Sequence, residues 1–259
     1  MIALDPLLEG GIGLAEFLIV LLKTVVVFGL LLGSVILMIW FERKVLGDLQ
    51  NRIGPNKAGP WGILQTLADG MKLILKEDNI PDKADRRVFI LAPFLSAVPA
   101  FVTFSIIPIA GAFDGDREGV VSLFGHDTYL QLADPPVGIL LFLAMSSIAV
   151  YGVMLAGWAS GSKYPLLGSV RASAQMVSYE AALGLTTATV VLVSGTLYTS
   201  EIAMRQASSF ADWNVVQVAF VPMIIFVIAA TAELNRPPFD LVEAEQELVG
   251  GFYTEYSSI

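Results

Sequence analysis

The chain has 259 residues, of which 55% are hydrophobic and only 15% charged, and its mean hydropathy is +0.71; this composition is too apolar for a soluble globular domain and is typical of a polytopic membrane protein. It contains no cysteine and a single histidine, His126, which excludes disulfides, thiolate metal sites, a cysteine nucleophile and a histidine metal cluster. The formal net charge of -9 argues against nucleic-acid binding.

Five apolar stretches reach the roughly 20 residues that a membrane-spanning helix needs. They cover residues 14–41, 88–112, 136–158, 170–194 and 214–232. The sequence therefore predicts an all-α bundle of five transmembrane helices that form one membrane domain over residues 1–259. We expect a cytoplasmic loop at 42–87 and an acidic cytoplasmic loop at 233–259.

The distribution of lysine and arginine predicts the orientation of these spans. Nine of the 15 cations lie between the first two spans, whereas the loops after the second and fourth spans hold only Arg117 and Arg205. Because cytoplasmic loops carry the excess of positive charge, we expect the N-terminus outside and both the basic loop and the acidic stretch on the cytoplasmic side.

Lys23 lies inside the first predicted span, roughly 14 Å from its outer end at a rise of 1.5 Å per residue. A lysine at such a depth costs about 2.5–3.5 kcal/mol on insertion scales. Two explanations are open: a counter-charge from Glu16, two turns earlier on the same face, or snorkelling of the side chain out of a long tilted helix.

The loop after the first span combines rigid turns with an amphipathic segment. Its Gly-Pro steps at 54–55 and 59–60 favour irregular backbone, and the turns suit either a pocket for a polar head group or an anchor to anionic lipid. Residues 61–76 repeat apolar side chains at three- and four-residue steps opposite Gln65, Asp69 and Lys72, which predicts a helix lying in the membrane interface. Such a helix either forms the entrance through which a lipid-soluble molecule leaves the bilayer, or has only a structural role on the membrane surface.

The second and fourth predicted spans carry residues that are unusual in a bilayer. Pro93, Pro99 and Pro108 predict that the second span is not straight. Glu180 lies roughly 15 Å into the fourth span, where an ionised carboxylate is expensive. We interpret Glu180 as a proton relay in preference to a structural hydrogen bond, with an ion-binding site as the other alternative. His126, in the outer loop, receives no chemical role.

Six carboxylates follow the fifth span, against one cation, Arg236. If Pro238 opens a helix, Asp240, Glu243 and Glu247 share one face at i, i+3 and i+7. Like charges at this spacing repel, which raises the proton affinity of some of them. The cluster suits a proton path, and the alternative is a solvated juxtamembrane loop.

Several motifs together carry a family resemblance. They are ERK at 42–44, QNRIGPN at 50–56, KYPLLG at 163–168, RASAQ at 171–175, SYE at 178–180, RPPFD at 236–240, EAEQEL at 243–248 and EYS at 255–257. From about Phe41 onward the chain closely resembles the family of the H subunit of bacterial NADH:quinone oxidoreductase (respiratory complex I), whose mitochondrial counterpart is NADH dehydrogenase subunit 1.

The resemblance implies a multi-pass subunit of the bacterial plasma (inner) membrane that takes part in proton translocation. It implies that a quinone, ubiquinone or menaquinone, is the substrate, in a chamber shared with hydrophilic partner subunits and lined in this chain by Glu42, Arg43, Arg52 and Asp69. It implies a proton-coupling channel toward antiporter-like membrane subunits, built from Glu180, Glu233, Asp240, Glu243, Glu245, Glu247 and Glu255. NADH, FMN and iron–sulfur clusters would belong to partner subunits, with no covalently bound cofactor and no metal in this chain, and the lipid bilayer would surround it.

Family members have eight spans, so we expect this chain to be incomplete at its C-terminus. The nearest alternative is the homologous membrane subunit of a membrane-bound hydrogenase or ferredoxin-linked complex, which carries similar acids and needs no quinone. A secondary transporter is disfavoured because no inverted repeat relates the two halves. A purely structural anchor for a hydrophilic arm is the third alternative.

Overall fold

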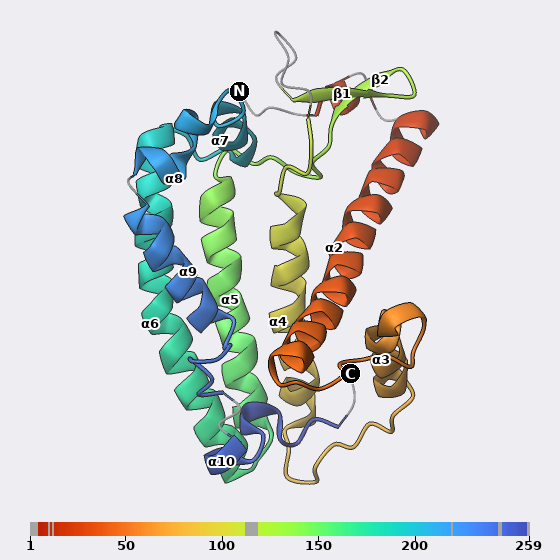
Figure 1. The fold of residues 1–259 in the computed structure, drawn as a ribbon, viewed down its shortest axis with the longest axis vertical. Helices are drawn as coiled ribbons and strands as arrows, with labels where there is room; N and C mark the ends of the chain where they lie inside the picture. The colour runs from red at the N-terminus through yellow and green to blue at the C-terminus, as the bar shows by residue number, and fades with distance from the viewer. Residues whose placement is uncertain are drawn as a thin grey trace. The chain divides into compact units, whose positions relative to one another are not determined.

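The computed structural model describes residues 5–9, 11, 13–111, 119–218, 220–242 and 245–257, and over these residues the chain is mostly helical, as predicted (Figure 1). It divides into two compact units. The first unit comprises residues 1–23 and 81–255, and the second comprises residues 24–80 and 256–259.

Three long helices and one shorter helix form the body of the first unit. They are α4 (Arg86–Ser105), α5 (Gly138–Ala159), α6 (Lys163–Ser194) and α9 (Val221–Glu233). Helix α5 lies between α4 and α6, and α6 also packs against α9 (Figure 1). A side chain on α6 can therefore meet residues of both α5 and α9.

Small residues let these helices approach closely, as is usual where helices pack inside a bilayer. A Cβ atom added to Gly152 of α5 would collide with Ser96 and with the backbone of α4. A Cβ atom added to Gly157 of α5 would collide with Pro165 and Ser169 of α6. Because both positions lack a side chain, α5 can pack closely against α4 at Gly152 and against α6 at Gly157.

The ends of the helices follow local capping chemistry. Asp85 caps α4, because its carboxylate accepts hydrogen bonds from the backbone N–H groups of Arg87 and Val88 at 3.1 and 3.4 Å. Helix α6 ends at Gly195, whose φ of 66° is left-handed. Of the three prolines predicted inside the second span, only Pro93 and Pro99 lie within α4, which ends before Pro108.

Short elements close the two ends of the first unit. At one end lie α1 (Pro6–Glu9), a hairpin of β1 (Val120–Leu123) and β2 (His126–Tyr129), α7 (Thr199–Arg205) and α8 (Asn214–Gln217) (Figure 1). At the other end lie α10 (Glu245–Leu248) and the single turn η3 (Gly251–Tyr253). The second end is held by a hydrophobic cluster of Val150, Val153, Ala172, Met176 and Val242, against which Phe252 and Tyr253 pack.

The second unit is built on the C-terminal part of α2 (Leu14–Leu49), a helix of 36 residues that outlasts its predicted span. The Gly-Pro loop folds back on α2, since a Cβ atom on Gly54 would lie 3.0 Å from the carbonyl oxygen of Arg43. The predicted interfacial helix is present as α3 (Gln65–Ile74), preceded by the short turn η1 (Pro60–Gly62). The indole N–H of Trp40 donates to the carbonyl of Trp61 at 3.0 Å and ties this turn to α2.

The prediction of a continuous fifth span is wrong. Within the described ranges, four helices are long and apolar enough to cross a membrane: α2, α4, α5 and α6. The stretch predicted as the fifth span is instead split into α8 and α9, with Phe220 between them in a left-handed conformation (φ 62°). A continuous helix would press the ring of Pro222 against the carbonyl of Val218 and lose a hydrogen bond there, which explains the break.

Candidate functional site

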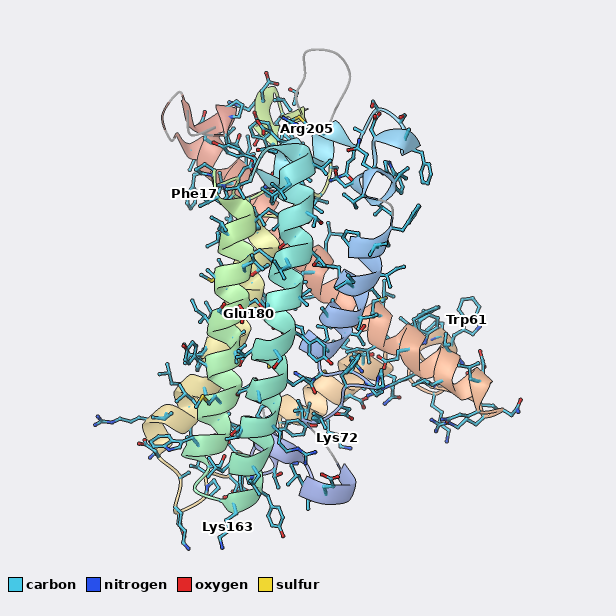
Figure 2. All side chains as sticks on the ribbon, turned by 90° about the vertical axis from the view of Figure 1, so that its left-hand side faces the viewer. Phe17, Trp61, Lys72, Lys163, Glu180 and Arg205 are labelled. Atoms are coloured by element: carbon cyan, nitrogen blue, oxygen red, sulfur yellow. The ribbon has the colours of Figure 1, made fainter. Side chains whose placement is uncertain are left out.

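Two acidic side chains meet neighbouring serines in the body of the first unit. Glu180 lies midway along α6 (Figure 2), and the hydroxyl of Ser147 on α5 donates a hydrogen bond to its carboxyl group. The hydroxyl of Ser146, the preceding residue on α5, donates to Oε1 of Glu233 at 3.0 Å. Because α6 packs against both α5 and α9, carboxyl groups from two helices are brought to one turn of a third.

Glu180 lies within one of the long helices, as predicted, whereas the position of Glu233 does not follow from the sequence. Glu233 was expected in the acidic loop and is instead the last residue of α9. Its Oε2 atom is buried and has no hydrogen-bond partner among the described residues. Sequence reasoning also missed the two serines, although consecutive hydroxyls inside an apolar span are a detectable signal.

The helix expected to start at Pro238 and carry three acids on one face is not present over the described residues. Residues 234–242 form turns, and beyond them the described residues hold only the short helix α10 and the single turn η3. Asp240 is half-buried in this turn region. Glu243 and the side chain of Glu245 lie outside the described residues, and Glu255 is half-buried in a turn after η3.

Gln175 on α6 holds the turns in place of that helix. Its side chain is only 7% exposed, and Nε2 lies within hydrogen-bond distance of the carbonyls of Ala232 (2.9 Å) and Phe239 (2.8 Å) and of Oδ1 of Asn235 (3.1 Å). The ring of Phe239 also meets Tyr179 edge to face at 5.3 Å between centroids. No local pattern in the sequence predicts this contact of Gln175 with the start of the acidic stretch.

Replacing Gln175 with leucine should release this turn region. Each buried carbonyl left without a donor costs about 1–3 kcal/mol, so residues 234–248 should become accessible to limited proteolysis in membranes. Ser178→Ala is the matched control, because the Ser178 hydroxyl bonds only the Ala174 carbonyl of its own helix. Equal cleavage of the Gln175→Leu and Ser178→Ala proteins would contradict the role of Gln175 as an anchor.

Glu247 is paired with a cation instead of another acid. Nη1 of Arg171, near the start of α6, lies 2.6 Å from Oε2 of Glu247. Glu247 is 65% exposed, and exposed pairs of this kind contribute roughly 0–1 kcal/mol. The contact therefore orients Glu247 more than it stabilises the fold.

In the second unit, the structure joins two of the four residues predicted for the quinone chamber. Nη1 of Arg43 lies 2.5 Å from Oδ2 of Asp69, and the side-chain amide of Gln65 donates to Oδ1 at 2.9 Å. The hydrogen bonds from Arg43 and then Gln65 lower the pKa of the Asp69 carboxyl below its usual value. Glu42 and Arg52 are both exposed.

Neither of the two explanations considered for Lys23 is correct. Lys23 is only 6% exposed, and its ammonium donates to Asp5 at 2.6 Å and to the hydroxyl of Thr128 at 2.8 Å. Glu16 instead lies 3.8 Å from the ring of His126. The counter-charge was missed because it comes from Asp5, just before the short helix α1, and the hydroxyl was missed because the hairpin that supplies Thr128 was not predicted.

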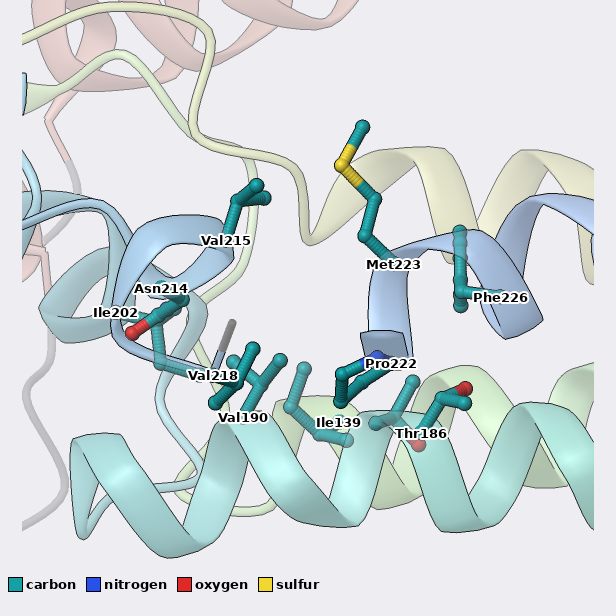
Figure 3. A pocket seen from close by; sticks show the side chains of 11 residues that line it. Ile139, Thr186, Val190, Ile202, Asn214, Val215, Val218, Pro222, Met223 and Phe226 are labelled. Carbon is teal, nitrogen blue, oxygen red and sulfur yellow. The ribbon is translucent and has the colours of Figure 1, made fainter. Parts of the chain in front are cut away.

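An apolar cavity of about 280 Å³ lies nearer to the end of α6 that leads into α7 (Figure 3). Ile139, Val190, Met223 and Phe226 are among its lining residues. The hydroxyl of Thr186, which also lines it, bonds carbonyls of its own helix. The cavity thus has a mainly apolar lining, and neither Glu180 nor Glu233 is among its lining residues.

Four helices long and apolar enough to cross a membrane define, over the described residues, a polytopic helical membrane protein with carboxyl groups held between its helices. The chain belongs to the NADH dehydrogenase family, whose family model matches residues 22–259. This confirms the resemblance found in its motifs.

Three curated relatives are each named as the H subunit of NADH-quinone oxidoreductase. The protein of Frankia alni is 52% identical over 256 residues, which cover 98% of this chain and 54% of that protein. The protein of Frankia casuarinae is 52% identical over 94% of this chain and 51% of its own length, and that of Streptomyces avermitilis is 48% identical over 93% and 51%. The chain therefore spans about half the length of the curated relatives it matches.

Proposed function

We propose that the chain is a membrane subunit of a proton-translocating NADH:quinone oxidoreductase, in which it forms part of a quinone chamber and the start of a proton path. The observation that supports this most is the pair of carboxyl groups, Glu180 and Glu233, each hydrogen-bonded to a serine of α5. Placing an ionisable side chain inside a bilayer costs free energy, and such side chains are commonly functional. The name shared by the relatives supports the same proposal.

The proton path in this proposal continues from the two half-buried acids, Glu180 and Glu233, into the acidic stretch. Asp240, Glu243, Glu245, Glu247 and Glu255 would pass protons on toward antiporter-like partner subunits. Arrival of electrons at the quinone changes the local charge, and acids that interact electrostatically respond to such a change together. The electrons would come from NADH through FMN and iron–sulfur clusters on hydrophilic partners, while this chain supplies carboxyl groups and polar side chains only.

The second unit supplies the proposed quinone-facing residues of this chain. Arg43 of α2 and Asp69 of α3 form a charged pair, and Glu42 and Arg52 would line the same chamber. The guanidinium can donate to a quinone oxygen while its other donors remain on the carboxylate. The protein would lie in a bacterial plasma membrane with its N-terminus outside, so that this loop faces the cytoplasm.

Purification of the intact complex that contains this chain tests the proposal. We expect NADH oxidation that depends on added quinone, stops with an inhibitor of the quinone chamber, and acidifies the lumen of inside-out vesicles. A complex that evolves hydrogen and ignores quinone would instead identify the chain as the membrane subunit of a hydrogenase or ferredoxin-linked complex.

Arg43→Ala should raise the apparent KM for quinone about tenfold, the effect of roughly 1.4 kcal/mol of lost binding, with a smaller change in kcat. Arg43→Lys keeps the charge but not the planar donors, so its KM for quinone should lie between those of the wild type and Arg43→Ala. The lowered pKa of Asp69 keeps this carboxyl ionised down to a lower pH than an ordinary aspartate, and the pair is lost only when the pH falls through that lowered value. The ratio of mutant to wild-type KM should therefore be constant between about pH 6 and pH 8. A KM for quinone unchanged in Arg43→Ala would count against a quinone-facing role.

A further inference from the structure

Two consecutive residues of α5 serve two different acids. Ser147 bonds Glu180 of α6 and Ser146 bonds Glu233 of α9. Among the described residues, no other side chain hydrogen-bonds either carboxyl group. Whatever these acids do in the membrane, the two serine hydroxyls are their immediate polar surroundings.

Ser147 can satisfy Glu180 in both of its protonation states. A hydroxyl has one proton and two acceptor lone pairs, and the Ser147 oxygen also lies 3.1 Å from the carbonyl oxygen of Leu143, one helical turn earlier. When Glu180 is ionised, the serine proton points to the carboxylate. When Glu180 is protonated, the acid donates to the serine oxygen and the serine proton turns to the Leu143 carbonyl.

Ser146 can do the same for Glu233 by a different geometry. It donates to Oε1 at 3.0 Å, whereas Oε2 is buried and has no hydrogen-bond partner in the part of the chain that the structure describes. A proton on Oε2 leaves Oε1 free to accept. The hydrogen bond from Ser146 is therefore kept whether Glu233 is ionised or neutral.

We propose that Ser146 and Ser147 are positioning residues that hold Glu233 and Glu180 in both protonation states, so that neither acid leaves its place when it gains or loses a proton. This inference rests on the proposed function, because it assumes that the two acids change protonation during turnover. The serines do not carry the proton themselves. Each serine instead keeps one hydrogen bond to its acid in both states, so that gaining or losing a proton does not cost the acid this bond.

Matched variants of Ser147 in the intact complex, reconstituted in liposomes, test this inference. Threonine and valine have nearly the same shape, but only threonine keeps the hydroxyl. Ser147→Val should lower quinone-coupled proton pumping about tenfold or more, as expected when a hydrogen bond to a charged group is lost, and Ser147→Thr should restore it. Thr189→Val is the control, because the Thr189 hydroxyl bonds only the Thr186 carbonyl of its own helix. The same comparison applies to Ser146→Val and Ser146→Thr.

Infrared difference spectra measure the hydrogen bonding of the Glu180 carboxyl group directly. A purely structural role of Ser147 would leave this signal unchanged. The carboxyl stretching band of Glu180 is identified as the band that Glu180→Gln removes. In Ser147→Val this band should move to higher wavenumber, because the carboxyl group loses its hydrogen bond, and in Ser147→Thr it should stay in place.

The possible outcomes separate the inference from the proposed function. If Glu180→Gln pumps normally, the proposed function fails and the inference fails with it. If Glu180→Gln is impaired but Ser147→Val has the rate and the band of the wild type, only the inference is overturned. Equal impairment of the valine and threonine variants would trace the defect to shape and would also overturn it.

Discussion

Replacing Glu180 with glutamine should lower proton pumping and quinone-reductase activity of the complex by about 10²-fold or more, the usual contribution of a positioned acid or base, while the complex still assembles. Glutamine has the shape of glutamate and can still accept the hydrogen bond from Ser147, but it cannot exchange a proton in the working range. Pumping is measured in inside-out vesicles as acidification per NADH oxidised, and assembly by native electrophoresis.

Glu201→Gln is the matched control for this experiment, because Glu201 lies on α7, outside the long helices. It should retain normal coupling. Unchanged pumping in Glu180→Gln would favour a purely structural role for the chain and would end the assignment of Glu180 to a proton path.

Lys23→Met should destabilise the first unit by about 3–5 kcal/mol, the usual cost of removing one partner from a buried ion pair. The change leaves the carboxylate of Asp5, only 18% exposed, without its cation. The hydroxyl of Thr128 and the backbone N–H of Leu7 would remain as neutral hydrogen-bond donors to that carboxylate. Thermal unfolding of the complex in nanodiscs should shift to lower temperature, and proteolysis near the N-terminus should become faster.

The double variant Lys23→Met, Asp5→Asn identifies the cause of this effect. Because asparagine is neutral and can still bond Thr128, the double variant should recover much of the lost stability, which makes the two changes non-additive. Additive losses would show that Lys23 acts through packing of its aliphatic stem and not through charge.

The long helices and the intramembrane acid could be predicted from the sequence because both depend on local properties. In lipid, a single apolar run of sufficient length satisfies its own backbone hydrogen bonds only as a helix. The expected depth of Glu180 follows from its distance along such a run. Membrane-length helices at α4, α5 and α6 confirm this reasoning. The amphipathic spacing of residues 61–76 likewise led to α3.

The failures concern contacts between residues that are far apart in the sequence. Lys23 finds its counter-charge at Asp5 and a hydroxyl at Thr128, 105 residues away. Residues 239–242 form turns instead of the first part of the predicted helix, and Gln175, on another element, bonds the carbonyls of Ala232 and Phe239 there. The periodicity of a single segment holds no information about contacts with distant residues. Local patterns therefore predicted the helices but not the side-chain contacts between them.

The interruption between α8 and α9 decides which changes Glu233 can tolerate. Since α9 has 13 residues and begins anew after Phe220, an insertion in residues 214–218 can be absorbed at the break without rotating the acid. One extra residue inside α9 would turn everything beyond it by about 100°, which would point Glu233 away from Ser146. The direction in which this side chain points is thus set by the packing of α9 on α6 and by the bond to α5, and does not depend on the helical register of α8.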